Sequence, residues 1–109
     1  MARVQDASGN SANLEGIANG MQHRAVTCGT ASVEVAPAVA SRRYLLLVND
    51  STSPIWINIG ATAVANEGVR INAGGGSYEM SAANGNLSSR AVNGISDAVT
   101  KILLVTESD

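Results

Sequence analysis

From residue 23 onward, apolar and polar residues alternate in short runs that are separated by turn residues. Side chains two positions apart in a strand point to the same face, so this alternation predicts strands with one buried side. Ile55, Ile57 and Ile59, for example, share one face of their segment, and Trp56 lies on the other. The pattern predicts eight strands, at residues 24–28, 31–36, 43–49, 54–60, 67–72, 76–80, 87–93 and 99–106. We therefore expect residues 23–109 to form an all-β domain, a jelly-roll-like antiparallel β-sandwich.

The segments between these runs are rich in residues that favour turns. In residues 50–54, Asp and Ser side chains can bond to the backbone, and Pro54 fixes φ at the entry to the next strand. Asn84-Gly85 and Asn93-Gly94 tolerate positive φ, which predicts hairpin turns at both positions. Residues 61–68 are long enough for one helical turn at most, so they do not change the all-β prediction.

Two runs, "RYLLLVN" at 43–49 and "KILLVTE" at 101–107, are apolar on both faces. A strand with one face in water carries polar residues on that face, so two apolar faces lead us to expect that both are covered. The cover could be the other half of the sandwich, the N-terminal arm or another subunit.

Residues 1–22 are rich in Gly, Ala, Asn and Ser and show no sustained period, which predicts an extended N-terminal arm. Leu14, Ile17 and Met21 are its isolated apolar residues. They are candidates for anchors on a neighbouring subunit, and a disordered tail is the alternative.

Composition narrows the classes of function. The chain has 109 residues, enough for one domain, and a net charge of -2 with seven scattered basic residues, so we expect no nucleic-acid partner. No apolar run is long enough to span a membrane, and residues 1–16 lack a signal-peptide pattern, which predicts synthesis in the cytoplasm. A single cysteine and the lack of a metal-ligand pattern leave oligomer contacts as the means to stabilise a small domain.

Residue types that carry chemistry are few and scattered. His23 is the only histidine, and Cys28 reads as a small buried residue of a strand. Glu34 and Glu79 could form a carboxylate pair, but their spacing does not select them. The glycines at 74–76 lack the spacing of a phosphate-binding loop. We expect no enzymatic activity, no catalytic residue, no cofactor and no metal.

Trp56 and Tyr78 are the aromatic residues with a choice of roles. An exposed aromatic side chain can stack on a sugar or anchor an interface. A single aromatic makes a poor sugar-binding site, so for Trp56 we favour the core or a subunit interface.

The run "SRRYLLLVNDSTSPIWINIGATA…GVRINAGGGSYEM", residues 41–80, resembles a pattern in small virion proteins of tailed bacteriophages. The shared features are an Arg-Tyr-Leu-Leu strand, a polar turn, Ile-Trp-Ile-Asn-Ile-Gly, and a glycine turn before Ser-Tyr-Glu. The resemblance implies a capsid decoration, or cement, protein with a jelly-roll-like fold. Such proteins clamp joints between major capsid proteins, often as dimers, and similar sandwiches occur in fibres and tails.

We therefore expect a non-enzymatic virion protein on the outside of the capsid. Its expected partners are the major capsid protein and further copies of the chain, with a dimer favoured. The candidate interface residues are Leu14, Ile17, Met21, Tyr44, Leu46 and Trp56. The main alternative is a fibre or tail component that binds a receptor or glycan and exposes Trp56 or Tyr78. A small hydrolase centred on His23 and an interaction domain of a cellular protein are the others.

Overall fold

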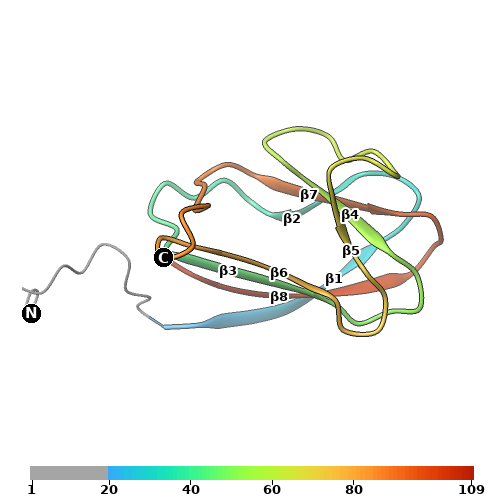
Figure 1. The fold of residues 1–109 in the computed structure, drawn as a ribbon, viewed down its shortest axis with the longest axis horizontal. Helices are drawn as coiled ribbons and strands as arrows, with labels where there is room; N and C mark the ends of the chain where they lie inside the picture. The colour runs from blue at the N-terminus through green and yellow to red at the C-terminus, as the bar shows by residue number, and fades with distance from the viewer. Residues whose placement is uncertain (1–19) are drawn as a thin grey trace, which may run out of the picture.

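A computed structural model describes residues 20–109, which form two antiparallel four-stranded sheets packed face to face (Figure 1). The strands are β1 (Gln22–Cys28), β2 (Val33–Ala36), β3 (Tyr44–Asn49), β4 (Ile55–Ile59), β5 (Val69–Ile71), β6 (Ser77–Ser81), β7 (Val92–Ser96) and β8 (Lys101–Ser108). Sheet A has the order β1-β8-β3-β6 and sheet B the order β2-β7-β4-β5. The predicted all-β sandwich is confirmed.

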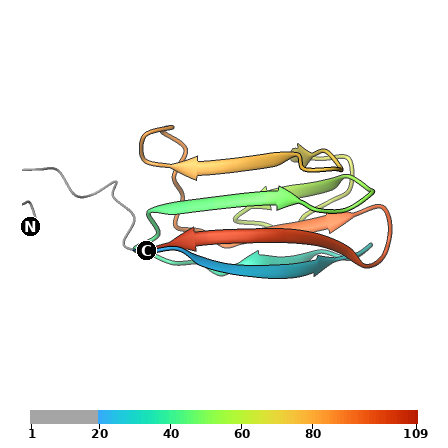
Figure 2. The ribbon, with the colours of Figure 1, turned by 90° about the horizontal axis from the view of Figure 1, so that it is seen from below.

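The strand order is that of a jelly roll. First and last strands pair, and the pairing continues inward along the chain as β1 with β8, β2 with β7, β3 with β6 and β4 with β5. Only the connection from β4 to β5 stays within one sheet, and each of the others crosses to the opposite sheet. Figure 2 shows sheet A from its outer side, with β6, β3, β8 and β1 side by side.

The core between the sheets follows the predicted alternation. Every second residue of the central strands is turned inward, including Leu45 and Leu47 of β3 and Leu103 and Val105 of β8. The opposite sheet contributes Ile55, Ile57, Ile71, Val35 and Val92 to the same cluster. The two runs that are apolar on both faces thus have their inner faces covered by sheet B.

The seventh strand is the one strand whose predicted position differs clearly from the observed one. Strand β7 spans Val92–Ser96 rather than 87–93, and Asn93-Gly94 lies inside it instead of forming a turn. A Cβ atom on Gly94 would lie 3.1 Å from Val35 Cγ1 and 3.3 Å from Cys28 Sγ. This glycine therefore permits close packing across the sandwich, a role that the local sequence does not separate from a turn.

The other turn predictions have clear outcomes. Gly85 has φ 76°, as expected for the turn at Asn84-Gly85. In the 50–54 turn, Ser51 Oγ donates to Asn49 Oδ1 at 2.7 Å, and the Asn49 amide donates to Ser53 O at 2.8 Å. Residues 61–68 form no helix.

Candidate functional site

The outer face of sheet A carries a stripe of aliphatic side chains along its two central strands. Alternation turns Leu46 and Val48 of β3 and Ile102 and Leu104 of β8 away from the core, and Val48 pairs with Leu104 in the register. We call these four residues the outer stripe. Leu104 is 39% exposed, and the other three are partly buried by their neighbours.

The outer stripe lies in the middle of the sheet and not at its edge, because β3 is hydrogen-bonded on both sides. In Figure 2 the face is turned toward the viewer, and no segment of residues 20–109 crosses it. Of the three covers considered for this face, the other half of the sandwich lies on the opposite side of the sheet. The N-terminal arm and another subunit stay predictions.

Polar contacts border the outer stripe on the β6 side. The Tyr44 hydroxyl donates to Glu79 Oε2 at 2.6 Å, and the Asn84 amide donates to Glu79 Oε1 at 3.1 Å. The hydrogen bond from Tyr44, followed by that from Asn84, lowers the pKa of Glu79. The same bond to Glu79 raises the pKa of Tyr44. The carboxylate therefore stays charged and fixes the Tyr44 ring beside the stripe.

On the β1 side, the border consists of small and polar side chains. Ala25 pairs with Leu104 and is exposed, and His23 Nδ1 lies 2.9 Å from Thr106 Oγ1. The structure thus places two predicted interface residues, Tyr44 and Leu46, on one face. Met21, 46% exposed, immediately precedes β1.

Trp56 has a different environment from the one expected of a contact residue. It points to the outer side of sheet B, yet only 4% of it is exposed, because it packs with Ala63 and Ile95 in a second small core. The Arg70 guanidinium lies 5.8 Å from the centre of its ring. Trp56 therefore offers almost no surface to a partner or a sugar. Of the two roles favoured for it, the core and a subunit interface, its burial fits the core, and its place among the candidate interface residues is not supported.

The segment 60–68 supplies this cover, and side chains hold it in place. Ser32 Oγ accepts a hydrogen bond from Ala63 N at 2.9 Å, and the Asn93 amide donates to Ala61 O at 2.6 Å. Gly68 has φ 84°, and a Cβ there would lie 2.5 Å from Ile57 O. Small side chains can lie flat over the indole ring of Trp56, which explains why this segment is rich in alanine.

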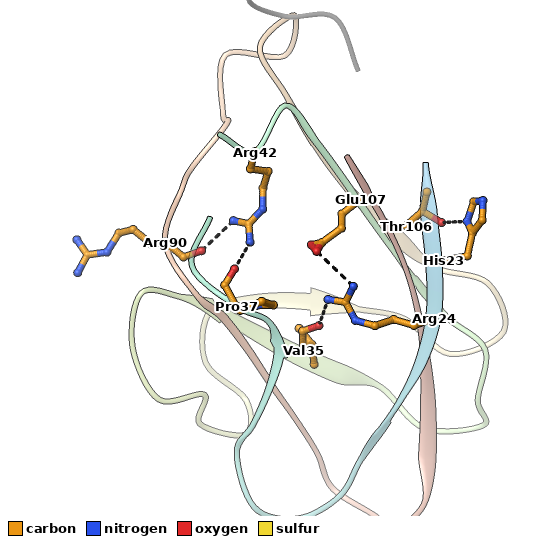
Figure 3. A network of polar contacts seen from close by, with 8 residues as sticks. All are labelled: His23, Arg24, Val35, Pro37, Arg42, Arg90, Thr106 and Glu107. Carbon is orange, nitrogen blue, oxygen red and sulfur yellow. Dashed lines mark hydrogen bonds and ion pairs between the residues drawn. The ribbon is translucent and has the colours of Figure 1, made fainter. Parts of the chain in front are cut away.

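A cluster of charged side chains lies between the sheets at the end of the sandwich near the C-terminus (Figure 3). Arg24 of β1 donates to Val35 O of β2 at 2.8 Å and pairs with Glu107 of β8 at 3.3 Å. Arg42 is 4% exposed. Its guanidinium donates to Ser88 O and Arg90 O, both at 2.8 Å, and to Pro37 O. The cluster joins both sheets and two of their connections.

A cleft of about 160 Å³ opens beside this cluster, and its lining residues are Gln22, Val39, Arg42, Glu107, Ser108 and Asp109. Burial lowers the pKa of Arg42, and the nearby charge of Glu107 acts in the opposite direction. Arg42 Nε and Glu107 Oε1 are buried without a hydrogen-bond partner in the part of the chain that the structure describes. The bonds of Arg24 join β1 to β2, and those of Arg42 join the connection between β2 and β3 to the connection between β6 and β7, so the cluster holds these segments together.

The residues considered for catalysis do not come together. Cys28 points into the core, whereas His23 lies on the outer face of the same strand. Burial raises the pKa of the Cys28 thiol to about 11, so it stays protonated at neutral pH. Glu34 faces outward from sheet B and Glu79 from sheet A, on opposite sides of the sandwich.

Within residues 20–109, no group of three or more His, Cys, Asp or Glu side chains is arranged to hold a metal ion. The same residues contain no helix of the length and apolarity needed to cross a membrane. Leu14 and Ile17 lie outside the described residues. No family model, no curated protein and no solved structure matches the chain.

The structure adds residues that the sequence did not single out. Ile102 and Leu104 of β8 join Leu46 and Val48 of β3 on the outer face, and the apolar residues on both faces of β8 are the signal for them in the sequence. Arg42 carried no signal, because an arginine before a strand is ordinarily exposed.

Proposed function

We propose that this chain is a decoration protein of a tailed-bacteriophage capsid, which binds the outside of the shell and stabilises joints between major capsid proteins. The observation that carries the proposal is the outer stripe, an aliphatic surface at the centre of sheet A. The resemblance of residues 41–80, which include Leu46 and Val48, to small virion proteins also supports it.

The physical role of such a protein is to add buried surface across a joint of the assembled shell. Binding to the assembled state and not to free subunits stabilises that state by mass action. Burying the exposed part of Leu104 contributes about 0.6 to 1.2 kcal/mol per copy, from the value for a whole leucine side chain. Such contacts are weak singly, and they act through the many copies on one particle.

Tyr44 is suited to the border of this contact. Its hydroxyl is already bonded to Glu79 and its ring lies beside the outer stripe, so little conformational freedom is lost when a partner covers it. We place Trp56 outside the interface because the segment 60–68 buries it. The fibre or tail alternative requires an exposed aromatic residue. Tyr78 does not meet this requirement fully, because it is half-buried and its hydroxyl accepts a hydrogen bond from Asn86.

Co-sedimentation with undecorated, expanded heads of the phage that encodes the chain tests the proposal. We expect saturable binding, with a copy number comparable to that of the major capsid protein. Leu104→Asp should abolish binding. Val64→Asp is the matched control, because Val64 is an aliphatic residue, 46% exposed, on the loop over the opposite sheet.

Two outcomes would reject the proposal. The wild-type chain could fail to bind heads and be found instead in a few copies on tails, which would favour the receptor- or glycan-binding alternative. Leu104→Asp could fold and still bind heads as well as Val64→Asp does, which would exclude the outer stripe as the contact.

A further inference from the structure

The four edge strands of the sandwich differ in whether their free backbone groups are blocked. An exposed edge presents unpaired N–H and C=O groups to any other strand, and proteins block such edges with bulges, short strands, prolines or side-chain caps. The edges are β1 and β6 in sheet A and β2 and β5 in sheet B. Three of them carry such a device.

Strand β6 is capped by one side chain. The Asn86 amide donates to Glu79 O at 2.9 Å, and Asn86 Oδ1 accepts from Ser81 N at 3.0 Å. This amide takes the place that a peptide group of a neighbouring strand would occupy. The sequence shows no sign of the cap, because Asn86 reads as an ordinary turn residue.

The two edges of sheet B are blocked in other ways. Strand β2 has a bulge at Val35, whose carbonyl accepts a hydrogen bond from Arg24, and Pro37 follows directly after the strand. Strand β5 is only three residues long. Neither offers a regular ladder to another chain.

Strand β1 has seven residues and no such device within residues 20–109. Asp50 N donates to Ile102 O, so the even-numbered residues of β8 bond to β3 and the odd-numbered ones to β1. In the register of β1 with β8, this leaves His23, Ala25 and Thr27 with N–H and C=O groups that face the free edge. Their side chains are exposed on the outer face.

The free edge of β1 is complementary to itself. We propose that two copies of this chain pair through β1, antiparallel about a two-fold axis at Ala25, so that sheet A continues across the axis as an eight-stranded sheet. In this register Ala25 lies opposite Ala25 of the second copy, and His23 lies opposite Thr27 of the second copy. No other register uses all three free residues of both strands.

The side chains on the outer face of β1 are compatible with this pairing. Two alanines at the axis allow the strands to approach, and no charged side chain of the outer face lies opposite one of the same sign. Leu104 lies beside Ala25, so the outer stripes of the two copies would extend from both sides of the axis on one continuous face. The inference does not depend on the capsid proposal, because it concerns the free chain in solution.

Sedimentation equilibrium of the full chain, with charged substitutions at the axis, tests the pairing. The wild-type chain should be in monomer–dimer equilibrium at micromolar to millimolar concentration. Ala25→Lys and Ala25→Glu should each be monomeric, because the pair places like charges opposite each other. An equimolar mixture of the two variants should restore a dimer. Ser77→Lys, on the free edge of β6, is the matched control and should leave the wild-type equilibrium unchanged.

Amide exchange of the wild-type chain provides a second readout that needs no variant. The N–H groups of His23, Ala25 and Thr27 should gain protection as the concentration rises. A wild-type chain that stays monomeric would overturn the proposal. If these amides were protected in that monomer, residues 1–19 of the same chain would be the partner of the β1 edge instead of a second copy. A dimer that Ala25→Lys and Ala25→Glu leave intact, or a mixture that stays monomeric, would also overturn it.

Discussion

Replacing Arg42 tests whether the buried guanidinium holds the end of the sandwich together. It lies in the connection from β2 to β3 and donates to the backbone of the connection from β6 to β7, at Ser88 and Arg90, and to Pro37. Arg42→Ala removes all of these bonds and leaves three carbonyl oxygens without a donor. Hydrogen bonds to a charged group contribute about 1.5 to 3 kcal/mol each, and they are not additive.

We therefore expect Arg42→Ala to lower the free energy of unfolding by about 3 to 5 kcal/mol, a large part of the total for a small domain. Arg42→Lys keeps the charge but not the planar fork, so it should lose about half as much. Arg90→Ala is the control, because only the backbone of Arg90 takes part, and it should change stability by less than about 0.5 kcal/mol.

Urea unfolding, followed by circular dichroism and by the fluorescence of the buried Trp56, gives these values. The reasoning would be refuted by an Arg42→Ala chain within about 1 kcal/mol of wild type, since that is less than the value of a single charged hydrogen bond. An Arg42→Lys chain as stable as wild type would show that charge matters there and the fork does not.

Two further predictions concern the cores. Trp56→Ala should cost about 3 to 5 kcal/mol in urea unfolding, because it empties the centre of the second core, whereas Arg70→Ala should cost less than about 1 kcal/mol. Equal losses would contradict this assignment. For Cys28 the ordinary pKa of 9.0 rises to about 11 on folding, so stability is intact below pH 9 and falls as pH rises toward 11, by about 3 kcal/mol at most. Cys28→Ala should flatten that slope between pH 9 and 11, and an unchanged slope would show that other groups cause it.

The sequence predicts the sandwich well because alternation reports directly on burial. Seven of the strands were expected near their observed positions, and Ile55 and Ile57 face the core as predicted. The exception, β7, arises because an Asn-Gly pair has the same local signature in a turn and at a close contact between sheets. Only the neighbours of Gly94 across the core decide between the two.

The candidate site was predictable only in part. An apolar run on both faces of a strand is unusual, so the sequence singles out Tyr44 and Leu46 as candidates, and the same rule applies to Leu104. For Trp56 the sequence left the core and a subunit interface open, because its cover is a loop without a periodic pattern that folds back over sheet B. The open edge of β1 likewise follows from pairing partners and caps that are distant in the chain.

A cryo-electron microscopy reconstruction of expanded heads saturated with the chain would test the central claim most directly. The proposal predicts sandwich-shaped density over joints between major capsid proteins, with the outer stripe of sheet A against the shell and the loop over Trp56 facing solvent. Heads without such density, or density in which the outer stripe faces solvent, would contradict it.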